Sequence, residues 1–206
     1  MLPRIMAEPL YPLLALGRHR MEVDGDGVTT LVAGAGCPLS CAYCINKSLL
    51  RQAPTYVTAA ELYEKVRVDD LYFRATGGGL CFGGGEALLH LDFYGALRPL
   101  CGDWRFTAET SLNLPRETVE RAIGLFDDFI IDVKTLDPAV YRAYTGRDMG
   151  PLEGNLRFLA ERLPPERLQV RVPRIPGYND ATDQSKNEAA LREMGFSRIE
   201  QFDYMV

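Results

Sequence analysis

The sequence predicts an α/β fold in which mainly parallel strands form a partial (βα)6, TIM-like barrel. Three observations support this fold class. The 206 residues include 47% hydrophobic and 25% charged residues, which is ordinary usage for one globular domain. Apolar, β-branched runs alternate with helical patterns, as they do in parallel sheets. About six such βα units are present, fewer than the eight of a closed barrel.

Six short apolar runs are predicted to be strands. Residues 28–33 are rich in β-branched side chains, and residues 129–133 (FIIDV) have the continuous apolar character of a buried strand. The full set is 28–33, 80–82, 105–110, 129–133, 168–172 and 198–202. Because the carboxyl ends of parallel strands meet at one edge of the sheet, chemistry is expected at those ends.

Helical patterns fill the intervals between these strands. A helix is predicted to start at Thr58, because Thr58 and Glu61 form a capping-box pattern ahead of an apolar face that contains Leu62, Val66 and Leu71. The other helices are predicted at 88–100, at 118–126 with Pro115 in the first turn, at 138–144, at 152–163 and at 182–194, where Gly195 ends the helix.

The charge balance argues against two classes of partner. The chain has 23 Lys and Arg and 28 Asp and Glu, which gives a net charge of −5. Such a chain lacks the basic surface that nucleic acids and anionic membranes attract. No apolar run reaches the roughly 18 residues that a membrane-spanning helix needs. We therefore expect no nucleic-acid partner and no membrane partner.

Residues 1–27 are predicted to be an N-terminal packing segment, ahead of one domain at 28–206. The apolar part of this segment is short, is interrupted by Glu8 and Pro9, and precedes no cleavage site of small residues, so it is not typical of a signal peptide. The protein is therefore expected in the cytoplasm, where reducing conditions keep thiols free.

Three of the five cysteines crowd into eight residues, as Cys37, Cys41 and Cys44 with the spacing C-x3-C-x2-C. An odd number of cysteines with this crowding is typical of metal binding in a reducing compartment, and thiolates suit zinc or iron–sulfur clusters. A fourth ligand is missing, because a structural zinc site and a usual [4Fe–4S] cluster both take four. Neither His has the spacing of a zinc ligand, and the other two cysteines are isolated: His19, His90, Cys81 and Cys101.

A run of glycines, Gly83-Gly84-Gly85, ends the predicted strand at 80–82 and is followed by Glu86. Glycines let a ligand approach the backbone closely, and the carboxylate of Glu86 favours an ammonium group. The run does not match a phosphate-binding loop, because neither G-x4-G-K-[ST] nor G-x-G-x-x-G is present. A tight turn at a strand end is the alternative interpretation.

Together, the cysteine spacing with an aromatic residue at Tyr43 and the GGE sequence resemble the radical S-adenosylmethionine (radical SAM) superfamily. The resemblance implies that Cys37, Cys41 and Cys44 bind a [4Fe–4S] cluster, whose fourth iron binds SAM through its amino and carboxylate groups. It implies that an electron from the cluster cleaves SAM to a 5′-deoxyadenosyl radical. The backbone at Tyr43 would lie near the adenine.

Further segments resemble the branch of glycyl-radical-enzyme activases that includes pyruvate formate-lyase activating enzymes. They are Tyr43-Cys44-Ile45-Asn46, Gly84-Gly85-Glu86-Ala87-Leu88-Leu89, Glu109-Thr110, Asp132-Val133-Lys134, and Arg171 with the following residues 172–180. The resemblance covers residues 28–204, which is most of the chain.

This resemblance also implies ligand contacts. Gly84, Gly85 and Glu86 would hold the amino group of SAM, assisted by Glu109, and Lys134 would face its carboxylate. Asp132 would help to hold a monovalent cation, Arg171 would orient SAM or the substrate, and Ile175 would line the adenine pocket. The alternative for each charged residue is a solvated charge or an ion pair at a strand end, and for Ile175 it is a place in the core.

The chain departs from this branch in two places. Tyr204 is followed by Met205, where related activases have a histidine that contributes to SAM binding. The additional ferredoxin-like cluster insert of many activases is also absent, since only Cys81 lies between Cys44 and Glu86. An external electron donor such as flavodoxin or ferredoxin is therefore expected.

The predicted function is that of a radical SAM oxidoreductase that abstracts hydrogen from a protein or peptide, in particular an activase of a large glycyl radical enzyme. One alternative is a radical SAM maturase that acts on a small ribosomal peptide or on a small molecule such as a deazapurine precursor. A second is a non-catalytic iron–sulfur or zinc protein, which would need Cys81 as fourth ligand. A third is a family member that docks a partner without turnover.

Overall fold

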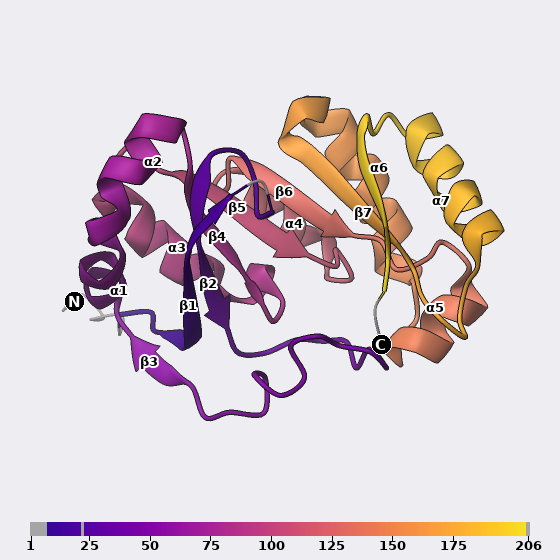
Figure 1. Ribbon diagram of the computed structural model, residues 1–206, viewed down its shortest axis with the longest axis horizontal. Coiled ribbons are helices and arrows are strands. Elements are labelled where there is room, and N and C mark those ends of the chain that lie inside the picture. Colours follow the sequence, from indigo (N-terminus) through magenta and orange to yellow (C-terminus); the bar gives the residue numbers. More distant parts are fainter. Residues whose placement is uncertain (1–7, 22, 205–206) are drawn as a thin grey trace, which may run out of the picture.

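The computed structural model describes residues 8–21 and 23–204, which form one eight-stranded sheet with the order β3-β1-β2-β4-β5-β6-β7-β8 (Figure 1). The strands are β1 Tyr11–Met21, β2 Val28–Gly34, β3 Thr55–Val57, β4 Gly79–Gly84, β5 Arg105–Thr110, β6 Asp128–Asp132, β7 Leu168–Arg174 and β8 Arg198–Asp203. From β2 to β8 all neighbours are parallel, whereas β1 pairs antiparallel with β2 and β3.

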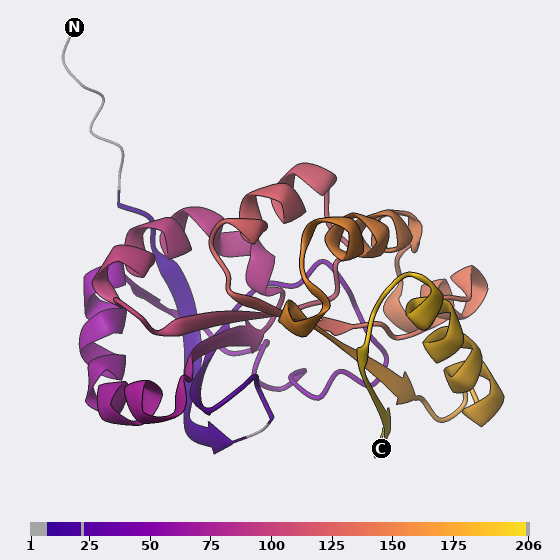
Figure 2. The same cartoon turned by 90° about the horizontal axis from the view of Figure 1, so that it is seen from above.

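The predicted fold class is confirmed. The six predicted strands are β2, β4, β5, β6, β7 and β8, which are the six parallel strands of the sheet. Within the described residues, β3 and β8 stand at opposite ends of the strand order and do not pair, so the barrel is open. In the two views the helices wrap around the sheet (Figures 1 and 2).

The helices bury an apolar core against the sheet. They are α1 Ala59–Val66, α2 Asp70–Thr76, α3 Leu91–Leu97, α4 Arg116–Ile123, α5 Pro138–Thr145, α6 Gly150–Arg162 and α7 Ala181–Glu193, with 3-10 turns at Arg67–Asp69, Ala87–His90, Arg98–Leu100 and Pro165–Arg167. Phe82 on β4 lies at the centre of the aromatic packing, with its ring centroid 4.5 Å from that of Tyr94 and 5.2 Å from that of Phe106. None of these described helices is both long and apolar enough to cross a membrane.

Local signals in the sequence explain several helix boundaries. Thr58 caps α1, and the predicted capping box forms in both directions with Glu61. Asp180 forms a second capping box at α7 with Asp183, and Gly195 follows this helix with φ +102°.

Two helix predictions need correction. Leu71 does not share the face of Leu62 and Val66, because the chain turns at Arg67–Asp69 before α2 and leaves Leu71 75% exposed. The predicted helix at 88–100 is divided into two 3-10 turns around α3, and Pro99, which has no N–H to donate, lies in the second turn.

The segment before β2 contains a strand that the sequence analysis did not predict. Its described residues include β1, a strand of the sheet for which the sequence pattern gave no strand signal. Residues 1–7 and 22 of this segment lie outside the described residues. The strand at 28–33 is therefore the second strand of the sheet.

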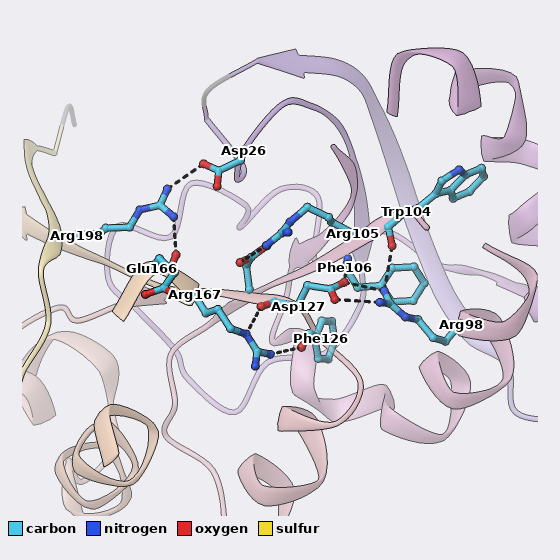
Figure 3. A network of polar contacts seen from close by, with 11 residues as sticks. Asp26, Arg98, Trp104, Arg105, Phe106, Phe126, Asp127, Glu166, Arg167 and Arg198 are labelled. Atoms are coloured by element: carbon cyan, nitrogen blue, oxygen red, sulfur yellow. Dashed lines mark hydrogen bonds and ion pairs between the residues drawn. The ribbon is translucent and has the colours of Figure 1, made fainter. Parts of the chain in front are cut away.

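The amino-terminal edge of the sheet is held by a network of arginines and acidic groups (Figure 3). Arg98 donates two hydrogen bonds, of 2.8 and 3.0 Å, to the carboxylate of Asp127, which also accepts the backbone N–H of Phe106 at 2.8 Å. Arg105 pairs with Asp128, and Arg198 donates to Asp26 at 3.0 Å. The charged groups named here form ion pairs with one another. We therefore assign them a role in stabilising the fold.

We expect Asp127→Ala to lower the free energy of unfolding by about 2 kcal/mol, because it leaves the buried N–H of Phe106 without an acceptor and removes a half-exposed ion pair. For a domain of this size, that corresponds to a melting temperature roughly 4–8 °C lower. Thermal unfolding followed by circular dichroism measures it. The control is Asp103→Ala, an exposed residue next to Trp104. Equal melting temperatures for the two variants would contradict a stabilising role for this network.

Candidate active site

A cavity of about 140 Å³ lies at the carboxyl ends of the parallel strands, on the opposite edge of the sheet from the arginine network. Ten of the twelve residues that the sequence predicts for the site line it: Cys37, Cys41, Cys44, Gly84, Gly85, Glu86, Glu109, Asp132, Lys134 and Arg171. They come from the loop after β2, from the ends of β4, β5 and β6 or the residues just after them, and, for Arg171, from the middle of β7. The parallel topology therefore brings together groups that are up to 134 positions apart in the chain.

The cysteine loop is anchored to α5 and the residues after it. The backbone N–H groups of Ser40 and Ala42 donate to the carbonyls of Thr145 and Tyr144, both at 2.9 Å. Arg147 donates to the carbonyl of Pro38 at 2.9 Å. These bonds hold the loop over the strand ends, where its three thiols border the cavity.

Partial burial raises the pKa of the Cys37 thiol to about 11 and also raises the pKa of Cys41. A metal would have to displace these protons when it binds. Within the described ranges, no group of three or more His, Cys, Asp or Glu side chains is gathered closely enough to hold a single metal ion.

The chemistry of the donor set nonetheless fits an iron–sulfur cluster. The three groups are soft thiols, and they face one cavity whose other walls include glycine backbone and charged side chains. Cys81 and Cys101 are buried elsewhere and are not among the residues that line this cavity. The described cavity therefore presents three thiols and no fourth.

The glycine turn packs its backbone directly against the start of the cysteine loop. The N–H of Gly85 donates to Gly34 at 3.0 Å, and the N–H of Glu86 donates to Gly36 at 2.8 Å. A Cβ at Gly85 would collide with the carbonyl oxygen of Gly36, and Gly84 has φ +83°. Glycine is therefore required for this close approach. Asn46 adds a bond of 2.9 Å to the carbonyl of Gly84.

Glu86 is buried, and its carboxylate already accepts hydrogen bonds from the protein. One oxygen accepts from the N–H of Leu88 at 3.2 Å, and the other accepts from the N–H and hydroxyl of Ser111 at 2.9 and 2.7 Å. Burial raises the pKa of Glu86, although these bonds oppose the shift. Glu86 thus joins the glycine turn to the loop after β5, a positioning role that its sequence pattern did not predict.

Lys134 is a buried cation in the wall of the cavity. Its ammonium donates to the Asp132 carboxylate at 3.1 Å. Burial alone would lower the pKa of Lys134, but the neighbouring Asp132, Tyr204 and Cys41 raise it above its usual value. Lys134 therefore stays positively charged at neutral pH.

Glu109 and Arg171 form a second ion pair, with 2.8 Å between Arg171 Nη1 and Glu109 Oε1. Burial raises the pKa of Glu109, and Arg171 opposes this shift. Arg171 also donates to the carbonyl of Val23 and lies 3.6 Å from Glu200. Both side chains line the cavity. In this structure they pair with each other, as the ion-pair alternative for these residues expected.

Two predicted residues do not line the cavity among the part of the chain that the structure describes. The ring of Tyr43 turns away and packs edge-on against Tyr178, with 5.8 Å between centroids. Ile175 is fully buried, which fits its alternative place in the core. The prediction for Tyr43 was that its backbone lies near the adenine of SAM. The position of the ring does not test that prediction.

Several cavity residues were given no role by the sequence analysis: Leu39, Ile45, Asn46, Thr110, Ser111 and Tyr204. Asn46 and Thr110 belong to the quoted motifs, within two residues of Cys44 and Glu109, respectively. Ser111 carries no pattern of its own, but it directly follows β5, whose carboxyl end borders the cavity. Met205, the noted departure, lies outside the described residues.

Comparison with known proteins gives consistent results. The family model described as "Radical SAM superfamily" matches residues 31–186. A (2S)-3-sulfopropanediol sulfolyase activating enzyme of Bilophila wadsworthia is 26% identical over an alignment of 233 positions. The alignment covers 83% of this chain and 76% of the relative. A pyruvate formate-lyase-activating enzyme of Clostridium pasteurianum is 33% identical over 141 residues, covering 65% of this chain and 59% of the relative.

Among solved structures, Streptococcus suis SuiB has a similar fold, with a TM-score of 0.63 at 17% identity over 85% of this chain and 40% of SuiB. The match to the Clostridium protein likewise spans less than two thirds of that relative's length.

Proposed function

This chain belongs to the radical SAM superfamily, and we propose that it is an activating enzyme that generates a glycyl radical on a large partner enzyme. One observation carries the proposal: three cysteine thiols, a glycine turn and a buried lysine face one cavity at the carboxyl ends of parallel strands. The names of both relatives described above, which are activating enzymes, support the choice of activity.

Members of this family use a [4Fe–4S] cluster and SAM. When bound, the cluster supplies an electron that cleaves SAM to a 5′-deoxyadenosyl radical, which takes a hydrogen atom from the substrate. In this chain Cys37, Cys41 and Cys44 would bind the cluster as thiolates. The backbone of Gly84 and Gly85, which borders the cavity, would take the amino group of SAM.

The charged walls of the cavity would orient the rest of the ligand. Lys134 presents a positive charge at neutral pH, which suits the carboxylate of SAM. Asp132 accepts a hydrogen bond from Lys134 and is partly exposed, so it can also face a monovalent cation. The ion pair of Glu109 and Arg171 would fix the positions of these two side chains in the cavity wall.

The proposal includes two protein partners. The substrate is a protein or peptide, here a glycyl radical enzyme. An external one-electron donor such as flavodoxin or ferredoxin would reduce the cluster, because the sequence holds only one compact cysteine group.

The rival interpretation as an electron carrier or zinc protein needs a fourth protein ligand. Cys81 was its candidate, but this side chain is fully buried on β4 and does not border the cavity among the described residues. Three thiols facing a cavity favour a site that takes an external ligand.

The direct test is reconstitution of the cluster without oxygen, followed by SAM and a strong reductant. We expect one cluster per chain and formation of 5′-deoxyadenosine. Addition of a candidate partner, a large enzyme with a C-terminal glycyl loop, should then give the electron paramagnetic resonance signal of a glycyl radical. A cluster without SAM cleavage would refute the enzyme proposal. Cleavage with modification of a short peptide instead would support the maturase alternative.

A further inference from the structure

The segment that carries the three cysteines differs in charge from the rest of the chain. From residue 27 to residue 60 the sequence has no Asp or Glu, although the whole chain has 28 of them. The same stretch contains two cations, Lys47 and Arg51. In Figure 1 the loop between β2 and β3 runs along the lower edge of the molecule as far as α5. An acidic chain therefore has a positive segment, and this segment holds the proposed cluster ligands.

Both cations are exposed and lie close to the third cysteine. The N–H of Lys47 donates to the carbonyl of Cys44 at 3.1 Å, and the N–H of Leu50 donates to the carbonyl of Asn46 at 2.8 Å. These two successive turns fix the stretch beside Cys44. Among the residues that the structure describes, neither Lys47 nor Arg51 forms an ion pair, so both charges remain open to a partner.

Arg147, which follows α5, adds a third positive charge at the start of the cysteine loop. Its Nε donates to the carbonyl of Pro38 at 2.9 Å, so the guanidinium lies against the loop. The adjacent acid, Asp148, pairs instead with Arg142 at 3.1 Å. The field around the cysteine loop is therefore positive, although the net charge of the chain is −5.

Two exposed apolar side chains flank Cys44. Tyr43 is 37% exposed and Ile45 is 78% exposed. Apolar side chains beside charged ones are typical of a surface that binds another protein. The ring of Tyr43 turns away from the cavity, and neither Lys47 nor Arg51 lines it. A protein can therefore contact this surface, next to a proposed cluster ligand, without entering the cavity.

We propose that Tyr43, Ile45, Lys47 and Arg51 form a docking surface for an acidic one-electron carrier protein that reduces the cluster. This inference rests on the proposed function. Opposite charges steer such a partner to the loop and orient it there. One electron passes from the carrier to the cluster, so the carrier is oxidised by one electron, the cluster is reduced by one, and no atom is transferred. The protein substrate, in contrast, has to place its reacting carbon inside the cavity, which these two cations do not line.

The test measures how tightly the carrier binds and how this depends on salt. The probe is a flavodoxin with a net negative charge, and its dissociation constant is determined for the cluster-loaded wild type and for the double variant Lys47→Glu/Arg51→Glu. The matched control is Arg157→Glu/Lys186→Glu, which makes the same change in net charge at exposed positions of α6 and α7. Iron content and melting temperature verify that each protein is loaded and folded.

We expect flavodoxin to bind Lys47→Glu/Arg51→Glu at least about tenfold more weakly at low ionic strength, because two attractive charges become repulsive. The difference should shrink at about 0.5 M salt, where surface charges are strongly screened. The control should bind flavodoxin like the wild type. Dithionite is a small reductant that needs no docking surface, so 5′-deoxyadenosine formation with dithionite should be equal in all three proteins.

Three results would overturn the inference and leave the proposed function standing. They are equal flavodoxin binding by the wild type and Lys47→Glu/Arg51→Glu, an equal loss in the control, and a wild type that binds no flavodoxin. Loss of glycyl-radical formation with dithionite at unchanged flavodoxin binding would also overturn it, since the surface would then belong to the substrate enzyme. A loaded wild type that forms no 5′-deoxyadenosine with dithionite would refute the proposed function itself.

Discussion

Cys41→Ala is expected to abolish both cluster binding and SAM cleavage. Cys41 is the central thiol of the three that border the cavity, and no other cysteine in the described cavity can replace it. Removal of groups that only support a metal ligand commonly costs 10–100-fold, so loss of a ligand should reduce 5′-deoxyadenosine formation by more than about 100-fold. Iron content and the absorbance of the reconstituted protein measure the cluster, and product analysis measures the cleavage.

The matched control is Cys101→Ala, a buried cysteine that does not line the cavity. This variant should keep its iron and its activity, with at most a modest loss of stability from the removed sulfur. Because Cys41 is only half-buried in a loop, Cys41→Ala should fold like the wild type, which circular dichroism can verify. A Cys41→Ala protein that retains a full complement of iron and cleaves SAM would show that the thiols do not form the centre.

The strands that could be predicted are those whose local pattern and tertiary environment agree. Residues 105–110 were predicted as a strand with the bounds that β5 has, and every other parallel strand was predicted within three residues at each end. A continuous apolar run is sufficient for β6, because its three central residues are buried on both faces of the sheet. In β5, apolar and polar residues alternate instead, which is the other strand pattern. The capping box at Thr58 was predictable for a similar reason, since it involves only neighbours in sequence.

β1 could not be predicted because its strand structure depends on a partner. Its apolar half contains Pro12, its second half contains Arg18 and Arg20, and its pairing with β2 is irregular between Gly17 and Arg20. Neither half has the alternation of a regular strand. β1 is instead stabilised by backbone hydrogen bonds to β2 on one side and β3 on the other, which the local sequence pattern does not reveal.

The site shows the same division. That the strand ends meet at one edge follows from the parallel topology, so the residues on those ends could be predicted to lie together. Which side chains pair could not be predicted. Glu86 accepts from Ser111, 25 positions away, and Arg171 pairs with Glu109, 62 positions away. Such pairings depend on side-chain direction and on loop geometry, and neither can be inferred from the spacing of residues in the sequence.

Lys134→Met is expected to weaken SAM binding roughly 30- to 100-fold, the second largest effect after loss of a cysteine. The side chain is buried in the cavity wall, and methionine fills a similar volume without charge. A hydrogen bond to a charged group contributes about 1.5–3 kcal/mol, and burial of the ammonium places the interaction at the upper part of this range. Titration of the cluster-loaded variant with SAM measures the loss.

Two comparisons separate this effect from a general loss of structure. Lys186→Met changes an exposed lysine on α7 that lies 3.7 Å from Asp183, so it should bind SAM like the wild type. Decarboxylated SAM should bind Lys134→Met no more weakly than it binds the wild type, because the ligand offers no anion for Lys134 to hold. Weakened binding of decarboxylated SAM to Lys134→Met would instead place the effect in the Asp132 pair, since Asp132 would then be left without its cation in the same wall.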